Sequence, residues 1–440
     1  MVKRQMARAC ALTWLLALGF YDMRAVAWSA EPLPLEQAGK QEPIAAGLTL
    51  TQALELALAK NAELAALRNE LRASEADIAQ AGVLPNPTLG IAAENLGNGR
   101  LSGDGDRATS IEFGQLIELG GKRAARVKIA ETARDVTQWD YRAKVLEVQT
   151  RVRQSFIDVL ASQQKLALVS ESTTLAQQFA DAVGKRVTAG KVSPVEETKA
   201  RLELSAAQIE REQAKRELDA ARNRLGATWN DPAPRFAQAI GDLAQLTPLP
   251  KYGELNRRIR NNPDLARWRS EIASRKATID AERAKAVPDL SIGAGVSRFS
   301  RFDDHAYTIS LSLPLPLFDR NRGGVLAANR RLDKTMDERR AAETRITAEL
   351  AQAYSRLAAI RNEAETLRTS VLPGAQSAFD AANKGYQLGK FGFLDVLDAQ
   401  RTLFRAREQH LRALADYHRG TNEIERLIGA PLNQPPRSKP

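Results

Sequence analysis

The sequence predicts a mainly α-helical protein with a small β part, organised as an internal two-fold repeat. Aromatic residues make up only 5% of the 440 residues, while Ala, Leu, Arg, Glu and Gln dominate long stretches, which is typical of extended helices. Residues 122–183 contain neither Gly nor Pro. As one helix, this stretch would extend roughly 90 Å, which is more than a single globular domain accommodates. In addition, a set of landmarks recurs after about 200 residues.

The two copies keep the same order of landmarks, which chance similarity between Ala-rich helices would not preserve. The first copy contains Asn61-Ala62-Glu63-Leu64-Ala65, and the second contains Asn262-Pro263-Asp264-Leu265-Ala266. Three later pairs follow in register: Leu84-Pro85 with Val287-Pro288, Gly190-Lys191 with Gly389-Lys390, and Leu225-Gly226-Ala227 with Ile428-Gly429-Ala430. We therefore expect structural repeats over 48–230 and 251–430, joined by a linker over 231–250.

The first thirty residues have the chemistry of a secretory signal peptide. An apolar run over residues 9–20 follows three basic side chains and precedes Ala25-Val26-Ala27, a small-residue cleavage site; the basic residues are Lys3, Arg4 and Arg8. The run is too short to cross a ~30 Å hydrocarbon core as a helix, which argues against a membrane anchor. We expect a signal peptide over 1–27, with cleavage after Ala30 as the alternative, and an N-terminal extension over 28–47.

The only cysteine is Cys10, which lies inside the expected signal peptide. The mature chain would then have no disulfide, no thiolate metal ligand and no cysteine nucleophile. Lipidation is not expected, because a lipoprotein cysteine would follow the apolar run instead of opening it.

Each repeat is expected to open with a helix of roughly thirty residues, over 51–81 and 252–286, that ends before Pro85 or Pro288. A β-hairpin then follows, over about 87–118 and about 289–317. The alternation is clearest in the second hairpin, where small polar residues separate apolar ones; the apolar residues are Tyr307, Ile309, Leu311 and Leu313.

Two long helices complete each repeat. They are expected over 120–188 and 193–226 in the first copy, and over 321–388 and 393–428 in the second. Sharp corners at 190–194 and 389–392 reverse the chain between them. The Pro-rich tail over 431–440 has no predicted structure.

The expected strands imply that several copies of the chain assemble. Strands of about ten residues with one apolar face have the length needed to span lipid when tilted. Lipid tolerates no open sheet edge, and the smallest closed membrane barrels need about eight strands, so four strands must be completed by other copies. Three copies would form a twelve-stranded β-barrel in the membrane, continued by a long α-helical barrel.

Other classes of function fit poorly. The formal net charge is +11, but basic and acidic residues alternate at helical spacing, which favours solvated helix faces over a nucleic-acid interface. Gly120, Gly121, Lys122 and Arg123 resemble the end of a phosphate loop, yet Leu116 replaces its first Gly and Arg123 its Ser or Thr, so we interpret them as a strand-to-helix junction.

Nothing in the sequence predicts an enzyme, a cofactor or a metal site. The chain has three histidines, of which His410 and His418 are more than two helical turns apart. Asp303-Asp304-His305 is the one metal-like triplet, and a solvated hairpin loop is the simpler interpretation of it.

Several motifs together resemble the TolC-like outer-membrane efflux factor family, and within it the CzcC-type channels of cation efflux systems. They are Leu50 to Leu58 with Asn61, the turn Leu84-Pro85-Asn86-Pro87, Glu118 with the junction, and Gly385-Tyr386 through Gly389 to Asp395-Val396-Leu397-Asp398-Ala399-Gln400. The resemblance implies a homotrimer in outer-membrane lipid with a periplasmic helical extension. It also implies a periplasmic membrane-fusion adaptor and an inner-membrane RND pump as partners, and export of cobalt, zinc, cadmium or nickel cations.

The resemblance further implies roles for three groups of residues. Asp395 and Asp398 would form a carboxylate ring at the periplasmic aperture, although acidic residues in a first helical turn also complement the helix dipole. The two tips would contact the adaptor, with packing between protomers as an equal alternative; they comprise Gly190, Lys191, Val192, Ser193, Gly389, Lys390, Phe391, Gly392 and Phe393. No catalytic residue is implied.

Three other functions remain open. The same type of channel serves multidrug or organic efflux and type I secretion, because the pump selects the cargo. A periplasmic coiled-coil scaffold would explain the signal peptide and the helices, but not the two hairpins. Nucleic-acid binding would require that the signal peptide be false.

Overall fold

The computed structural model describes residues 47–94, 96, 107–299 and 303–432. All the described elements belong to one compact unit, Ile44–Pro440. The expected signal peptide, nearly all of the N-terminal extension and most of the C-terminal tail lie outside the described residues.

The described part of the first repeat contains four helices: α1 (Leu50–Lys60), α2 (Ala62–Ala81), α3 (Lys122–Thr188) and α4 (Pro194–Ala227). The single opening helix expected over 51–81 is therefore wrong, because Asn61 has an extended backbone that separates α1 from α2. Its side-chain oxygen accepts the N–H of Leu64 and caps α2, and its amide nitrogen donates to the carbonyl of Thr228 at 2.8 Å.

The second repeat has the same interruption. Its opening helix divides into α5 (Tyr252–Arg258), a 3₁₀ turn (Ile259–Asn261) and α6 (Pro263–Ala284). Asn262 takes the place of Asn61 and donates from its side chain to the carbonyl of Leu427 at 2.9 Å. Three further helical segments follow: α7 (Arg322–Thr366), which passes through a π-helical turn (Leu367–Val371) into α8 (Leu372–Gln387), and α9 (Phe393–Ile428).

Both hairpins contribute to one antiparallel sheet of four strands. In space the order is β2 (Thr88–Glu94), β3 (Ala108–Ile117), β5 (Leu290–Phe299) and β6 (Asp304–Ser312). The register sets Leu89, Phe113, Ala294 and Ile309 in one row across the sheet, and Gly90, Glu112, Gly295 and Thr308 in the next. Because adjacent rows face opposite ways, one face is apolar and the other consists mostly of small and polar residues.

A second, smaller sheet joins the start of the first repeat to the segment expected to be a simple linker. β1 (Leu48–Thr49) pairs in parallel with β4 (Ala239–Ile240). Leu48 is fully buried, and it belongs to a hydrophobic cluster that includes Val152, Phe156 and Trp229. The segment between the repeats is thus part of the core.

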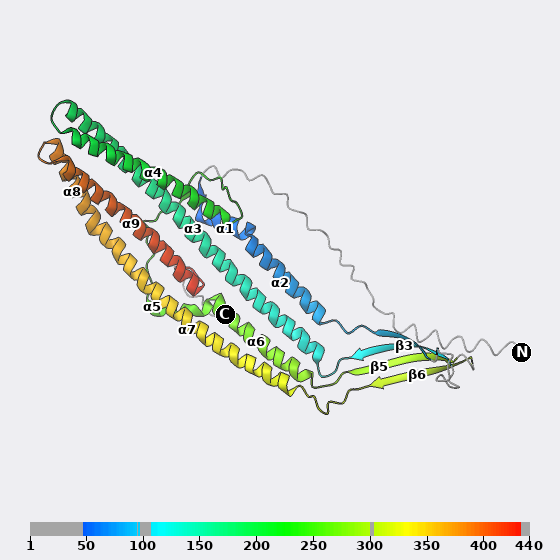
Figure 1. Ribbon diagram of the computed structural model, residues 1–440. Helices are drawn as coiled ribbons and strands as arrows, with labels where there is room; N and C mark the ends of the chain where they lie inside the picture. Colours follow the sequence, from blue (N-terminus) through cyan, green and yellow to red (C-terminus); the bar gives the residue numbers. More distant parts are fainter. Residues whose placement is uncertain (1–46, 95, 97–106, 300–302, 433–440) are drawn as a thin grey trace. The chain divides into compact units, whose positions relative to one another are not determined.

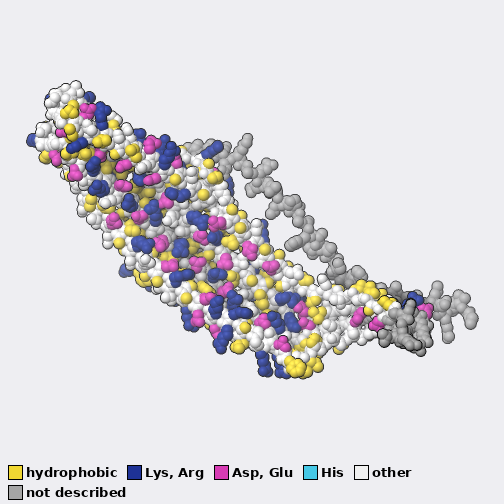
Figure 2. Space-filling view, in the orientation of Figure 1, with side chains coloured by type: hydrophobic (Ala, Val, Ile, Leu, Met, Phe, Trp, Pro, Cys, Tyr) yellow, Lys and Arg dark blue, Asp and Glu magenta, His cyan; other side chains and the backbone are white. Residues whose placement is uncertain are grey.

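The helices pack along α3, which contacts α2, α4, α6 and α9. The pairs α3–α4 and α8–α9 run side by side to two chain reversals, while the strands of the larger sheet lie at the opposite end of these helices (Figure 1). Charged side chains of both signs are interspersed along the helices, as Figure 2 shows. None of the described helices combines the length and the apolar character that crossing a membrane requires.

Candidate channel entrance and strand-to-helix junction

The first reversal connects α3 to α4 through a tight corner. Gly190 has φ +69°, a left-handed conformation that favours glycine, and the N–H of Lys191 donates to the carbonyl of Arg186 at 2.9 Å. The hydroxyl of Ser193 caps α4 by accepting the N–H of Val195. Lys191 and Ser193 are exposed, and Val192 is half-buried.

The second reversal, between α8 and α9, has the same construction. Gly389 has φ +70°, and the N–H of Lys390 donates to the carbonyl of Gly385 at 2.8 Å. The ring of Phe391 lies directly on Gly385: a Cβ atom added there would be 2.1 Å from Cδ2 of Phe391. Phe391 remains 50% exposed. In the single chain, this corner thus exposes an aromatic side chain to solvent.

Phe393 differs from the other residues expected at the tips. Its side chain is 4% exposed, and its ring packs against Phe179 and Tyr386 with centroids 6.4 Å away in each case. The interpretation of Phe393 as a surface contact is therefore wrong, because its ring belongs to the core between the two helix pairs.

Asp395 and Asp398 lie exposed at the start of α9, and their environments differ. Oδ2 of Asp395 accepts the N–H of Gly392 at 2.8 Å, so this carboxylate helps to cap the helix. Asp398 accepts no hydrogen bond within the described part of the chain. One turn later, Arg401 donates to Glu203 of α4 at 3.1 Å, and this bond raises the pKa of its guanidinium, with the charge of Asp398 adding to the effect.

Arg186 and Tyr386 connect the two helix pairs just behind their tips. The guanidinium of Arg186 lies 4.3 Å from the centroid of the Tyr386 ring and donates to the Tyr386 carbonyl at 3.3 Å. Arg186 comes from the last turn of α3 and Tyr386 from the last turn of α8. The tips are thereby linked within one chain, by a contact that is both cation–π and hydrogen bonded.

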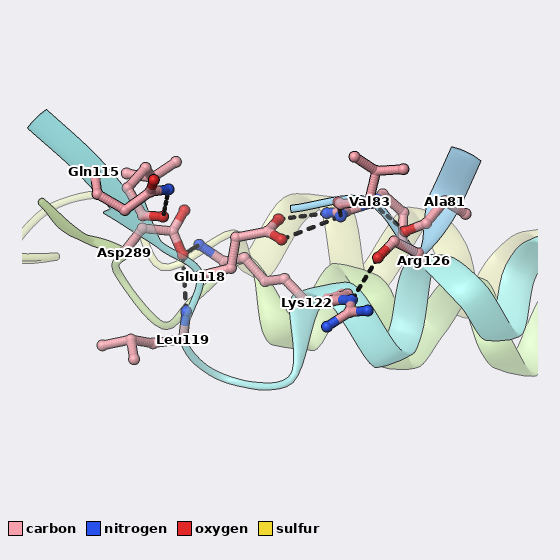
Figure 3. Close-up of polar contacts among 11 residues, drawn as sticks. Ala81, Val83, Gln115, Glu118, Leu119, Lys122, Arg126 and Asp289 are labelled. Carbon is pink, nitrogen blue, oxygen red and sulfur yellow. Dashed lines mark hydrogen bonds and ion pairs between the residues drawn. The ribbon is translucent and has the colours of Figure 1, made fainter. Parts of the chain in front are cut away.

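The other end of α3 begins at the junction with β3. Gly120 and Gly121 have φ +67° and +75°. A Cβ atom on Gly120 would lie 2.6 Å from Cβ of Val287, so only glycine fits at this turn. The ammonium of Lys122 lies 2.8 Å from Oδ1 of Asp289, and the same oxygen accepts the N–H of Leu119 at 3.1 Å (Figure 3).

A second ion pair stabilises the junction from the side of α2. Arg126 forms a two-pronged pair with Glu118, with Nη2 at 3.1 Å from Oε2. The same guanidinium donates to the carbonyls of Ala81 and Val83, where α2 ends (Figure 3). The bond to Glu118 raises the pKa of Arg126. These contacts join the start of α3, the end of α2 and the end of β3 into one unit. The junction therefore has a structural role, and the ammonium of Lys122 is already paired with the carboxylate of Asp289.

The described residues hold no group of three or more His, Cys, Asp or Glu side chains placed to bind a metal ion. Asp303, from the metal-like triplet, instead forms an ion pair with Arg298 at 2.7 Å. This pair lowers the pKa of the Asp303 carboxyl, chiefly through the hydrogen bond from Arg298.

Comparison with known proteins decides the family. A family model described as outer membrane efflux protein matches residues 53–231 and 255–430, one match in each repeat. The chain belongs to the outer membrane efflux protein family. It is 39% identical to the cobalt-zinc-cadmium resistance protein CzcC of Cupriavidus metallidurans over 87% of this chain and 90% of that protein. It is also 28% identical to the nickel and cobalt resistance protein CnrC of the same organism, over 79% and 77%.

Solved structures of outer-membrane channels share the fold. CusC matches with a TM-score of 0.74 and 19% identity, over 87% of this chain and 92% of that chain. VceC of Vibrio cholerae, described as an outer membrane protein, matches with a TM-score of 0.72 and 17% identity, over 87% and 97%. This member of the outer membrane efflux protein family thus has the TolC-like fold.

Within this efflux protein, the expected site residues fall into two groups at opposite ends of α3. The tips and the two aspartates lie at one end, and Gly120 to Arg123 lie at the other. Sequence reasoning did not assign roles to Arg186, Arg126 or Asp289. Asp289 had a usable signal, because it occupies the place that Asn86 has in the first copy and adds a charge there. Arg186 contacts Tyr386, which is 200 residues away in sequence, and Arg126 pairs with Glu118 across a strand-to-helix turn. Sequence spacing therefore indicates neither contact.

Proposed function

We propose that this chain is the outer-membrane channel subunit of a tripartite RND efflux system and that it exports divalent heavy-metal cations from the periplasm to the exterior. The candidate cargoes are cobalt, zinc, cadmium and nickel. The observation that carries the proposal is the 39% identity to CzcC, which extends over 87% of the chain and includes both repeats. Nickel-cobalt-cadmium resistance protein NccC of Alcaligenes xylosoxydans, at 27% identity over 69% of the chain, supports the same class of cargo.

The sheet supports a homotrimeric barrel. β2 and β6 each have one neighbour in the described sheet, so both edges are open for strands of other copies. Leu89, Ile91, Ile309 and Leu311 are 68% to 86% exposed on the apolar face. A closed barrel would satisfy the edges and place this face against lipid. Three copies would supply twelve strands.

The two tips and the two aspartates have separate roles in the proposal. The corners at Gly190 and Gly389 contact the periplasmic membrane-fusion adaptor, with Lys191, Lys390 and Phe391 as the exposed side chains. Asp395 and Asp398 line the periplasmic aperture, where three-fold repetition concentrates carboxylates. Such a ring attracts cations and repels anions without a tight site, and conduction requires binding that is weak enough for release.

Export and location complete the proposal. Residues 1–27 act as the signal peptide, the mature chain is not lipidated, and the channel uses no cofactor. The helices extend into the periplasm toward the inner-membrane RND pump, which supplies the energy and selects the cargo.

The test is the accumulation of zinc, cobalt, cadmium and nickel in cells that hold the matching pump and adaptor. We expect accumulation of at least one ion to rise when this chain is deleted and to fall when it is restored. A variant lacking the signal peptide is the control for export. If no ion responds while an organic compound accumulates, the cargo assignment is wrong, and organic export is favoured. The 25% identity to the pyoverdine export outer membrane protein OpmQ of Pseudomonas putida, over 82% of this chain, motivates that comparison.

A further inference from the structure

The apolar stripe on the outer face of β6 does not stop where the strand stops. Tyr307, Ile309 and Leu311 are 79%, 86% and 70% exposed, and β6 ends at Ser312. Beyond that point the alternation continues through an irregular segment toward α7, and its apolar members are Leu313, Leu315 and Leu317, which are 45%, 70% and 67% exposed. The stripe therefore belongs to a surface longer than the strand itself.

The length of this stripe matters because a membrane barrel needs an apolar band about 25 Å tall. The part on the strand, from Tyr307 to Leu311, spans only about 13 Å along the chain at about 3.3 Å per residue. Extension to Leu317 raises the span to at most about 33 Å, or about 25 Å along the barrel axis at a tilt of about 40°. The longer stripe therefore comes much closer to the required height than the strand does alone.

The backbone of the segment over residues 313–318, which we name the collar segment, suits an apolar environment. Unpaired backbone N–H groups are costly in lipid, so irregular chain is normally excluded from it. Pro314 and Pro316 carry no N–H. The N–H of Leu317 donates to the carbonyl of Leu315 at 2.8 Å. Three of the six positions of the collar segment, Pro314, Pro316 and Leu317, thus present no free N–H donor although the segment lies outside the sheet.

The end of the collar segment has the composition of a membrane interface. Phe318 is 99% exposed, and the exposed side chains of Arg320 and Arg322 follow it. Nε of Arg320 donates to the carbonyl of Pro316 at 3.1 Å, and Asp319 accepts the N–H of Asn321 at 2.8 Å, which fixes the turn. Figure 2 shows hydrophobic side chains gathered where the strands meet the helices, next to Lys and Arg side chains. Aromatic residues beside cations that reach toward phosphates are typical of this boundary.

We propose that the collar segment inserts into the periplasmic leaflet of the outer membrane, with Phe318 at the edge of the hydrocarbon and Arg320 and Arg322 at the phospholipid phosphates. The inference rests on the proposed membrane barrel and adds a second, non-strand contact with lipid. A neighbouring copy is the other candidate occupant. A strand added to the edge of β6 would pair in the plane of the sheet, however, and would leave outward-facing side chains uncovered.

The experiment uses nitroxide probes attached to single cysteines, because the sequence contains no cysteine after Cys10. Phe318→Cys is the test position. Ile309→Cys, at 86% exposure on β6, is the lipid reference, and Leu394→Cys, at 53% exposure in the first turn of α9, is the aqueous reference. The full mature chain is reconstituted in vesicles of phosphatidylethanolamine and phosphatidylglycerol. Collisions with oxygen, which concentrates in lipid, are compared with collisions with a polar paramagnetic chelate.

We expect the ratio of oxygen to chelate collisions at position 318 to exceed the ratio at 394 and to approach the ratio at 309 from below. A ratio equal to that at 394 would overturn the proposal, because the segment would then lie in water. Protection from both reagents would also overturn it and would assign the surface to a second copy. If the ratio at position 309 equals that at 394, the proposed membrane barrel itself is wrong. This outcome differs from one in which position 309 lies in lipid and only position 318 lies in water.

Discussion

The ammonium of Lys122 and the carboxylate of Asp289 meet at 2.8 Å, and they join the first residue of α3 to the residue that precedes β5. The two residues come from different repeats. Their side chains are 19% and 25% exposed, so the pair is largely shielded from water. The contact therefore ties the helical part of the first repeat to the sheet strand of the second.

Lys122→Ala should weaken this connection. The substitution leaves Asp289 with only the N–H of Leu119, and the loss of one partner of a largely buried polar pair costs about 1–3 kcal/mol. We expect a lower thermal unfolding midpoint in detergent, followed by circular dichroism. Lys128→Ala is the matched control, because its pair with Glu131 on the same helix is 63% and 42% exposed and should contribute less than about 1 kcal/mol. Equal effects of the two substitutions would contradict the assignment.

Asp398→Asn tests the role of the carboxylate charge at the aperture without disturbing the helix cap. Asp398 accepts no hydrogen bond within the described residues, so its neutralisation should leave the unfolding midpoint unchanged. It should lower the preference for cations in single-channel recordings, measured as the reversal potential across a salt gradient. Asp395→Asn should change both quantities, because Asp395 also accepts the Gly392 N–H.

Asp380→Asn is the control for charge alone, since Asp380 is exposed on α8 and bonded to Gln376 of the same helix. If Asp380→Asn changes the reversal potential as strongly as Asp398→Asn does, the location of Asp398 at the aperture has no special effect on cation preference.

Arg186→Ala should loosen the tips relative to each other. The substitution removes the stacking on Tyr386 and the bond to its carbonyl, which link α3 to α8. We expect a larger or more variable single-channel conductance, because the two helix pairs gain freedom at the entrance. Arg201→Ala is the control: Arg201 pairs with Glu197 on the same helix, and its loss leaves the link intact. Indistinguishable recordings from the two variants would refute a role for the link.

Gly385→Ala should displace Phe391. The added methyl group would lie 2.1 Å from Cδ2 of the ring, which cannot stay in place. We expect adaptor binding, measured by interferometry with purified protein, to weaken while the helices remain folded. Gly374→Ala offers the control on the same helix, where nothing lies within 4 Å. That change should leave binding unaltered and add up to about 1 kcal/mol of helix propensity.

Much of this architecture was predictable because it depends on local chemistry. The prolines at 85 and 288, the alternation in β6 and the glycines at 190 and 389 each act through the backbone of their own neighbourhood. The interruption at Asn61 was missed because asparagine is tolerated inside helices. Its side-chain oxygen caps α2 locally by accepting the N–H of Leu64, whereas the bond from its amide nitrogen to Thr228, more than 160 residues later in the chain, depends on tertiary packing.

The candidate site was predictable only in part, for the same reason. Asp395 and Asp398 follow from a compact motif, but the difference between them arises from the Gly392 N–H. Phe391 and Phe393 are the same residue type two positions apart. Only the structure shows that Phe393 is buried against Phe179 while Phe391 is half exposed. The sequence by itself determined the two repeats, the alternating faces of the strands and the places where the chain reverses, since period and backbone conformation are local properties. Tertiary structure alone decided which carboxylate meets Lys122, which ring covers Gly385 and how Arg186 reaches Tyr386, because such contacts depend on how distant segments pack.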